Sequence, residues 1–293
     1  MKVGFIGLGI MGKPMAKNLL KANYPVVVLA TNKAAGELIA AGATSAGSPR
    51  ELASAVDIVI AMLPNSPQVK EVLLGKNGVI EGAKAGTIVA DMSSIAPLVA
   101  QECARALAEK HIEMLDAPVS GGEPKAIEGT LSVMAGGKQE IFDKAFPVLK
   151  AMAASVVRTG EIGAGNITKL ANQIIVALNI AAMSEAYVLA TKAGVDPELV
   201  FNAIKGGLAG STVLNAKSPM IFDRNFKPGF RIKLHVKDLL NILETSHEVG
   251  VPLPLTSAVL EMMQSLNVGG EGESDHCALV KHYEKLAGVE VKR

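Results

Sequence analysis

The chain has 293 residues, of which 49% are hydrophobic, and it carries a formal net charge of +1 and only two cysteines. This length suits two domains, and the hydrophobic fraction is sufficient for a large core. The balanced charge, without a basic run, argues against nucleic acid or an anionic membrane as the main partner. Two cysteines make a poor disulfide framework and the N-terminus shows no signal-peptide pattern, so we expect a cytoplasmic protein.

The N-terminal stretch combines a buried strand, a glycine-rich turn and a helix. An apolar strand is predicted at residues 2–6 and a helical pattern runs to residue 22, with GLGIMG between them. In this position GxGxxG is typical of dinucleotide binding, because the glycines permit a tight turn, a close approach of the pyrophosphate and close packing of the helix. A turn that serves only packing is the alternative. The predicted cofactor contacts here are Gly7, Gly9, Ile10, Met11 and Gly12.

The second predicted strand, residues 26–29, ends without the acidic residue that commonly selects NAD. It is followed by Ala30, Thr31, Asn32 and Lys33, with no acid among them. An acid here would bond the ribose hydroxyls, whereas its absence leaves room for a 2′-phosphate. We therefore expect Thr31, Asn32 or Lys33 to contact the cofactor and NADPH to be tolerated or preferred, unless this end of the strand is simply exposed to solvent.

Further strands alternate with helical patterns through the N-terminal half. This alternation predicts an α/β fold, a Rossmann-type doubly wound parallel sheet. In such sheets ligands lie outside the carboxyl ends of the strands, so the loops after the strands are candidate binding segments. The additional strands are predicted at residues 57–63, 87–91, 112–115, 131–135 and 156–159.

Two of these loops carry hydroxyl groups. Ser94 follows the strand at 87–91, where it could cap the next helix or bond the nicotinamide ribose. Ser120, Gly121 and Gly122 follow the strand at 112–115. A hydroxyl with glycine N–H groups can hold a small carboxylate, and an ordinary flexible loop is the alternative.

Residues 166–193 contain neither glycine nor proline and are rich in good helix formers, which predicts one long helix. We expect it to join a dinucleotide-binding domain, residues 1–162, to a second domain, residues 163–293. Its longest apolar run, residues 174–183, is too short to span a bilayer. Near its start Lys169, Asn172 and Gln173 share one face, where a buried lysine indicates function and a lysine reaching the surface is the alternative.

The C-terminal half reads as helical throughout. Helices are predicted at 196–205, from 211 or 212, and at 232–249, 255–266 and 276–286, with Asp196 and Ser211 or Thr212 as N-terminal caps. No strand pattern is present, so an all-helical domain is expected. Histidine, cysteine and aspartate cluster near residue 276, but their spacing fits no zinc motif, and we expect no metal site.

With these motifs the chain resembles the β-hydroxyacid dehydrogenase family over nearly its full length. The combination and order of the motifs are far more specific than a single glycine motif. Segments 116–134, 207–214 and 224–232 are most similar to family members that reduce tartronate semialdehyde to D-glycerate. The matching motifs are GFIGLGIMG at 4–12, MLPNSP at 62–67, DMSSIAP at 91–97, DAPVSGG at 116–122, GAGNITKLANQ at 163–173 and KDL at 237–239.

The resemblance implies a role for each matching residue. It implies NAD(P)H as cofactor, a small semialdehyde or hydroxyacid as substrate, and a homo-oligomer, either a dimer or a tetramer. Lys169 would be the catalytic residue, and Asn172 would position the substrate. Ser120, Gly121 and Gly122 would hold the substrate carboxylate, and the dinucleotide would be lined by Gly7, Gly9, Gly12, Leu63, Pro64, Ser94 and Lys237.

This chemistry agrees with the residue types. Reduction of an aldehyde places negative charge on oxygen, where a lysine ammonium can stabilise it and donate a proton. Three alternatives stay open. These are a family member acting on 3-hydroxyisobutyrate or succinic semialdehyde, a non-enzymatic dinucleotide sensor, and a structural scaffold.

Overall fold

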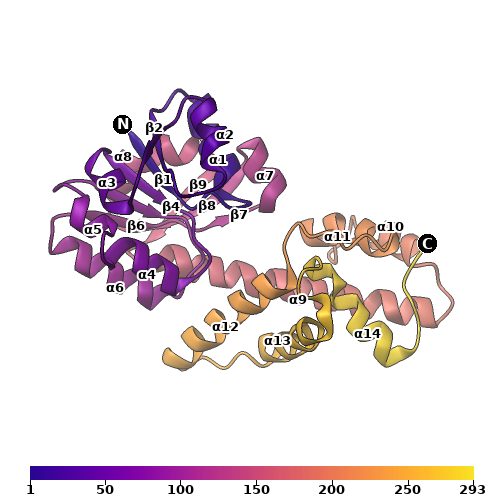
Figure 1. Cartoon of the computed structure of the whole chain (residues 1–293). Helices are drawn as coiled ribbons and strands as arrows, with labels where there is room; N and C mark the ends of the chain where they lie inside the picture. The colour runs from indigo at the N-terminus through magenta and orange to yellow at the C-terminus, as the bar shows by residue number, and fades with distance from the viewer. The chain divides into compact units, whose positions relative to one another are not determined.

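The computed structural model describes residues 1–293, which divide into two units, Met1–Lys169 and Leu170–Arg293 (Figure 1). The division falls within helix α9 (Ala164–Lys192), a few residues after the boundary expected between 162 and 163. Each unit has hydrophobic core clusters of its own.

The first unit is built on a nine-stranded sheet. The sheet order is β3-β2-β1-β4-β5-β6-β8-β7, with β9 paired to β8, and the strands from β3 to β6 are all parallel. The chain moves outward from β1 in both directions, so the doubly wound α/β prediction is confirmed. The strands are β1 (Val3–Ile6), β2 (Val26–Leu29), β3 (Thr44–Ala46), β4 (Ile58–Ala61), β5 (Ile88–Asp91), β6 (Glu113–Asp116), β7 (Val119–Ser120), β8 (Leu131–Gly136) and β9 (Ala153–Gly160).

The sheet departs from the sequence prediction in three places. It is not parallel throughout, because β8 runs antiparallel to both β6 and β7. Strand β3 was not predicted, since it is short and two of its three residues are exposed. The segment Ser120–Gly122 is not an ordinary loop, because Ser120 ends β7 and Gly122 begins the next helix.

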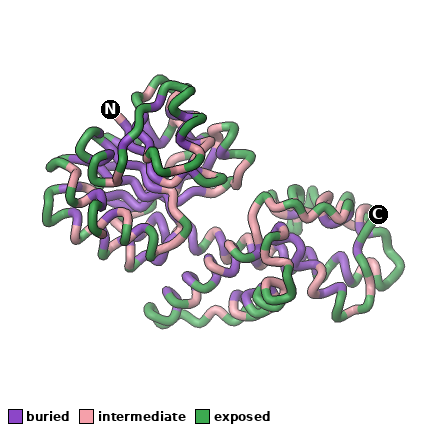
Figure 2. Tube along the Cα trace, in the orientation of Figure 1, coloured by how far each residue is buried: buried purple, intermediate pink, exposed green.

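Helices cover both faces of this sheet. Every residue of β1, β4 and β5 is buried, which is why these strands read as continuous apolar runs. Val3 and Phe5 belong to one core cluster and Ile6 to the other, as alternation along a strand requires. Figure 2 shows the buried stretches of the chain in purple. The helices are α1 (Gly12–Lys21), α2 (Ala35–Ala40), α3 (Pro49–Ser54), α4 (Ser66–Leu74), α5 (Val79–Gly82), α6 (Pro97–Ala108), α7 (Gly122–Glu128) and α8 (Gln139–Lys150).

The second unit is helical, as predicted, and its only β-type pairing is an isolated bridge between Arg231 and Asp275. The predicted caps are present: Asp196 accepts a hydrogen bond from the Glu198 N–H (2.8 Å) and Ser211 from the Leu214 N–H (2.9 Å). Besides the larger part of α9, the unit contains α10 (Pro197–Ile204), α11 (Thr212–Phe222), α12 (Ile232–Glu248), α13 (Pro254–Leu266), η1 (Asn267–Glu271), η2 (His276–Leu279) and α14 (Val280–Ala287).

Helix α9 is the one helix long and apolar enough to cross a membrane, with a mean hydropathy of 1.7 over its most apolar window. The sequence prediction considered only residues 174–183, an apolar run that contains Asn179 and is shorter than the helix. Core helices of water-soluble proteins have the same length and composition, so this property assigns no membrane role.

Candidate active site

The three glycines of the β1–α1 turn, Gly7, Gly9 and Gly12, are each explained by a different feature of the structure. Gly7 has a φ of 99°, and a side chain there would collide with the carbonyl oxygen of Met62. A Cβ at Gly12 would collide with the carbonyl oxygen of Gly7, so this glycine permits close packing of α1. A Cβ at Gly9 would meet no atom within 4 Å. Packing within the chain therefore does not explain Gly9, whereas a pyrophosphate approaching the backbone does.

The start of α1 also fits a phosphate group. Its N-cap residue, Met11, makes no side-chain capping bond, and the first turn contains no acidic residue. The N–H groups and the positive dipole end of the helix therefore favour an anion. Ile10 is 41% exposed beside this turn. The residues present thus fit the dinucleotide that the motif predicts.

The carboxyl ends of β1, β4 and β5 bring several predicted cofactor residues together. A Cβ at Gly7 would lie 3.2 Å from Leu63, which places the turn beside the end of β4. The Leu63 N–H in turn donates to Ser93 Oγ (2.9 Å), directly before Ser94. Gly7, Leu63, Ser94 and the Pro64 that follows Leu63 consequently gather at one sheet edge, next to the switch point between β1 and β4.

The end of β2 lies at the same edge, beside β1. Thr31 and Lys33 are exposed, and Asn32 Oδ1 accepts a hydrogen bond from the Ala34 N–H (2.9 Å), which shapes the turn before α2. Glu37, the first acid after β2, pairs instead with Lys13 (3.2 Å) and Lys17 (2.9 Å) of α1.

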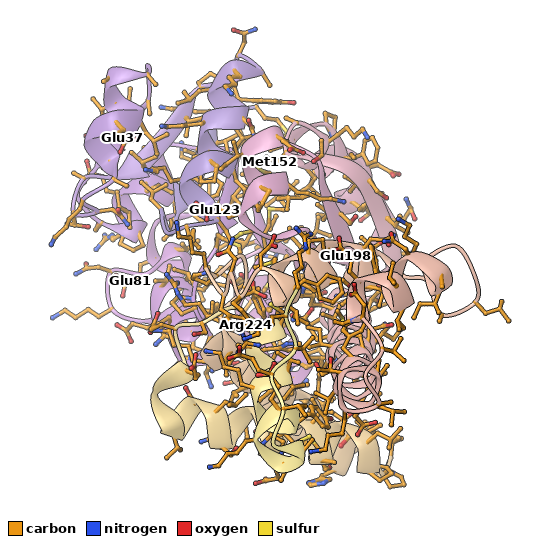
Figure 3. All side chains as sticks on the ribbon, turned by 90° about the vertical axis from the view of Figure 1, so that its right-hand side faces the viewer. Glu37, Glu81, Glu123, Met152, Glu198 and Arg224 are labelled. Atoms are coloured by element: carbon orange, nitrogen blue, oxygen red, sulfur yellow. The ribbon has the colours of Figure 1, made fainter.

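Hydrogen bonds from these two lysines lower the pKa of Glu37, the carboxylate labelled in Figure 3. The Glu37 carboxylate is therefore engaged with α1, and no other acid is positioned at the end of β2 in the sequence.

The start of α9 is fixed to the sheet by Asp116 at the end of β6. Asp116 is fully buried and accepts hydrogen bonds from the backbone N–H groups of Gly163 and Asn166, both at 2.7 Å. Burial raises the pKa of Asp116 to about 6, although these hydrogen bonds lower it. Asn166 Oδ1 also accepts from the Ile95 N–H (3.1 Å), one residue after Ser94. The first turn of α9 is thus tied to the ends of β5 and β6.

Close packing explains the glycines in this segment. A side chain at Gly165 would collide with the carbonyl oxygen of Asp116 and approach that of Met134. One turn after Asn166, Lys169 is buried, with 7% of its surface exposed. The sheet therefore determines where the helix that carries Lys169 begins.

Ser120 lies at a different part of the sheet from the glycine turn. It is half-buried on β7, where it pairs with Ser132 of β8. Gly121 and Gly122 have φ values of 139° and 68°, which the turn into α7 requires. Local geometry accounts for both glycines, and carboxylate binding at this segment stays a prediction.

In the second unit, Asn172 and Lys237 are linked by two residues that were not assigned a function from the sequence. Asn172 donates its amide to Gln173 Oε1 (2.9 Å), and Gln173 Nε2 donates to Asp238 Oδ2 (2.6 Å). The second oxygen of Asp238 pairs with the Lys237 ammonium (2.8 Å). Sequence signals existed for both: Gln173 is one turn after Lys169, and Asp238 belongs to the KDL motif.

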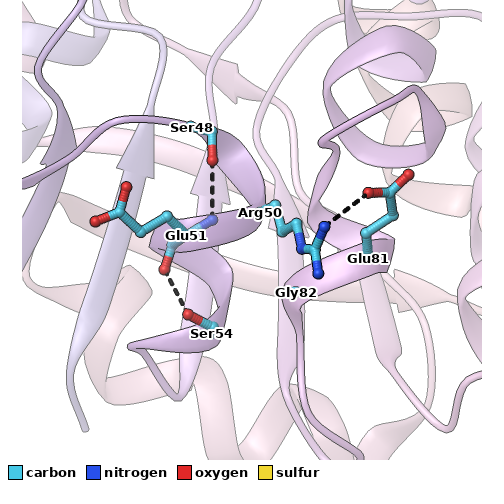
Figure 4. Close-up of a pocket in the computed structure, with 6 residues that line it drawn as sticks. All are labelled: Ser48, Arg50, Glu51, Ser54, Glu81 and Gly82. Carbon is cyan, nitrogen blue, oxygen red and sulfur yellow. Dashed lines mark hydrogen bonds and ion pairs between the residues drawn. The ribbon is translucent and has the colours of Figure 1, made fainter.

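A shallow hollow of about 330 Å³ between α3 and α5 contains none of the predicted site residues (Figure 4). Its polar groups serve local structure: Ser48 caps α3 through the Glu51 N–H (3.1 Å), and Ser54 donates to the Glu51 carbonyl (2.7 Å). Arg50 pairs with Glu81 at 3.7 Å. We assign no ligand to this hollow.

The sheet order and the glycine turn at its switch point define a dinucleotide-binding protein of the doubly wound α/β class. Comparisons with known proteins narrow this class. The family model for the NAD binding domain of 6-phosphogluconate dehydrogenase matches residues 2–160. The model described as the NAD-binding of NADP-dependent 3-hydroxyisobutyrate dehydrogenase matches residues 163–283.

Three relatives cover nearly the whole chain. The 2-hydroxy-3-oxopropionate reductase of Escherichia coli (strain K12) is 43% identical, over 98% of both chains. The 2-(hydroxymethyl)glutarate dehydrogenase of Eubacterium barkeri is 38% identical, over 99% of this chain and 97% of its own. A solved structure of Mycobacterium tuberculosis 3-hydroxyisobutyrate dehydrogenase with L-serine is 30% identical, with a TM-score of 0.90, covering 96% of this chain and 98% of that one.

The chain belongs to the β-hydroxyacid dehydrogenase family, as the motifs indicated. It is an oxidoreductase that uses a nicotinamide dinucleotide, and its fold is that of its relatives.

Proposed function

We propose that the chain reduces tartronate semialdehyde (2-hydroxy-3-oxopropanoate) to D-glycerate, using NADPH or NADH, with Lys169 as the general acid. The observation that carries this proposal is a lysine with only 7% of its surface exposed, in the first turns of a helix anchored to the sheet edge. Lysine is rarely buried, and a buried lysine at the ligand-binding edge of a doubly wound sheet is a candidate for chemistry. The 43% identity to a reductase named for this substrate supports the same choice.

The residues of the chain supply binding, orientation and a proton. Gly9 and the start of α1 would hold the pyrophosphate, and the bound reduced nicotinamide supplies the hydride. As the new C–H bond forms, negative charge develops on the aldehyde oxygen. Lys169 stabilises that charge and donates its proton to form the O–H bond, and the neutral amine then regains a proton from water.

The substrates named for three of the relatives have a chemical unit in common. Tartronate semialdehyde, 3-hydroxyisobutyrate and 2-(hydroxymethyl)glutarate each have a terminal aldehyde or hydroxymethyl carbon next to the carbon that bears the carboxylate. This supports the 2-substituted 3-oxopropanoates as the substrate class. Ser120 and the glycine N–H groups beside it are the groups we assign to the carboxylate.

A substrate panel tests this assignment. Tartronate semialdehyde, methylmalonate semialdehyde, 2-formylglutarate and succinic semialdehyde are each mixed with protein and NADPH or NADH, and loss of absorbance of the reduced cofactor is followed. We expect the highest kcat/KM for tartronate semialdehyde. A higher value for another semialdehyde would move the assignment within the family, and no turnover with any of them would exclude a reductase of this class.

Lys169 is tested on the same assay. Lys169→Ala should lower kcat by about two to four orders of magnitude, the usual size of general acid catalysis, while cofactor binding measured by titration is retained. Lys169→Arg should also be slow, because arginine keeps the charge but does not release its proton. Lys192→Ala, an exposed lysine on the same helix, is the matched control. Turnover close to wild type in Lys169→Ala would rule out the role.

A further inference from the structure

Helix α12 holds one residue of α9 at two points. His235 and Asp238 are one turn apart on α12 and share a face. The Nε2 atom of His235 lies 3.4 Å from the backbone oxygen of Gln173, while Asp238 accepts from the side-chain amide of the same residue at 2.6 Å. Since Gln173 bonds Asn172 and Asp238 bonds Lys237, this clamp determines where both predicted functional side chains are held.

A second histidine, His276, determines which ring nitrogen of His235 carries the hydrogen. The Nδ1 atoms of His235 and His276 are 3.0 Å apart, so one of them carries the hydrogen of this bond and the other accepts it. A carbonyl oxygen can only accept, so the one N–H of a neutral His235 is on Nε2, facing Gln173. Its Nδ1 is then an acceptor, and His276 is the donor. The orientation of His235 toward α9 consequently depends on His276.

His276 is itself fixed by a buried anchor. Asp275, which is fully buried, accepts both from Lys217 (2.9 Å) and from the backbone N–H of Gly229 (2.9 Å). Burial opposes its ionisation, but His276, Lys217 and the hydrogen bonds together hold the pKa of Asp275 at about 2. The ring of Phe230 packs edge-on against both imidazoles, at 5.6 and 5.5 Å between centroids. Residues outside α12 therefore hold the two histidines in place.

Two imidazoles are an unusual choice for this position. His235 is fully buried and His276 is 5% exposed, although the surrounding core is formed mainly by apolar residues. Packing alone would be served by leucine, which carries no buried polar atoms that need partners. A hydrogen-bonded pair adds direction, because it fixes the ring that faces Gln173. Charged groups lie next to both rings along the chain: Asp275, bonded to Lys217, directly precedes His276, and the Lys237–Asp238 pair follows His235 on α12.

We propose that His235 and His276 are positioning residues for the reduction, which hold Gln173 and Asp238 so that Asn172 and Lys237 are presented in a single orientation. The inference rests on the proposed function, because it assigns these two side chains to substrate and cofactor. Neither histidine touches the reacting atoms. Their effect is on kcat, through the geometry of the groups they hold.

Two substitutions of His276 separate positioning from packing. His276→Asn keeps an N–H donor close to the place of Nδ1, whereas His276→Leu fills a similar volume without a donor. We expect His276→Leu to lower kcat by about tenfold to a hundredfold, the size expected for a misplaced reacting group. His276→Asn should recover most of the loss. Equal kcat in wild type, His276→Leu and His276→Asn would overturn the inference.

A spectroscopic measurement on the wild type does not depend on the variants folding. The chain has five histidines, so ¹⁵N-histidine labelling gives few signals, and His235→Gln identifies the signal of His235. We expect His235 as the neutral tautomer with hydrogen on Nε2. Hydrogen on Nδ1, or a charged His235 ring, would overturn the arrangement.

The two proposals fail in different ways. A wild-type protein that reduces no semialdehyde removes the proposed function, and the positioning role with it. An active wild type that depends on Lys169 but tolerates His276→Leu removes only the positioning role.

Discussion

Thr31 is one of the residues that follow β2 (Val26–Leu29), the segment where a side chain commonly selects between the two nicotinamide dinucleotides. An acid at the end of β2 bonds the ribose hydroxyls of NAD and repels the 2′-phosphate of NADP. Here no acid follows β2 until Glu37, which is bonded to Lys13 and Lys17. The exposed Lys33 adds a positive charge to this segment.

Thr31→Asp should therefore shift the preference toward NADH. We expect the ratio of kcat/KM for NADPH to that for NADH to fall at least about tenfold, because one like-charge contact with the 2′-phosphate changes transition-state binding by about 1.4 kcal/mol or more. Thr31→Ser, which keeps the hydroxyl and adds no charge, is the control and should leave the ratio close to wild type. An unchanged ratio in Thr31→Asp would show that residue 31 does not contact the 2′-position of the cofactor ribose.

At the scale of the element, two glycines of the β1–α1 turn should affect different properties: Gly12 the stability of the fold and Gly9 the affinity for the cofactor. Gly12→Ala should destabilise the first unit or prevent its folding, since the new Cβ collides with the backbone of Gly7. Gly9→Ala has open space and should keep the wild-type melting temperature. It should nevertheless weaken cofactor binding by about tenfold or more, because the added methyl group stands where the pyrophosphate approaches.

Calorimetry and cofactor titration on the same two variants check this contrast. Gly36→Ala on α2, where a Cβ also meets no atom within 4 Å, is the control for both measurements. Unchanged cofactor affinity in Gly9→Ala would show that this glycine is not the point of approach.

The elements that the sequence predicted well are those whose signal is local. Buried central strands such as β1 and β4 are continuous apolar runs, and the caps at Asp196 and Ser211 are defined within four residues. Strand β3 has no such signal, because most of it is exposed at the sheet edge. The reversed direction of β8 follows from how the chain returns to the sheet, which no local pattern records.

The site shows the same division. The glycine turn and the burial of Lys169 could be predicted from the sequence because spacing and composition mark them. The clamp on Gln173 could not be predicted, because His235 and Asp238 are 62 and 65 residues away from it in the sequence. The anchor formed by Asp116 likewise became apparent only when the start of α9 was placed at the end of β6.

At the scale of the whole molecule, Asp116 in the first unit and Asp275 in the second are both fully buried, and their pKa values are displaced in opposite directions. For Asp116 in the first unit, burial outweighs the hydrogen bonds and raises the pKa from 3.8 to about 6. For Asp275 in the second unit, burial also acts to raise the pKa, but His276, Lys217 and hydrogen bonds outweigh it and lower the pKa from 3.8 to about 2. The two units should therefore respond differently to acid.

The signs follow from linkage between protonation and folding. The folded first unit binds a proton at Asp116 more tightly than the unfolded chain does, so this contribution to stability is complete below pH 3.8 and is lost as the pH rises through about 6. Asp275 releases its proton more readily when folded, so its contribution is present above pH 3.8 and is lost as the pH falls through about 2. Because each tenfold change in proton affinity corresponds to about 1.36 kcal/mol, these contributions are on the order of 3 and 2 kcal/mol.

Asp116→Asn and Asp275→Asn, unfolded in urea at several pH values, test these signs. Peptides from each unit, followed by mass spectrometry, report the two unfolding transitions separately. The loss of stability caused by Asp116→Asn should grow by about 2 kcal/mol between pH 7 and pH 4, because only the wild type gains from protonation there. The loss caused by Asp275→Asn should be constant over that range and shrink below it. A loss that does not vary with pH for Asp116→Asn would mean that its hydrogen bonds, and not burial, dominate its ionisation, and that the start of α9 is held by a permanently charged carboxylate.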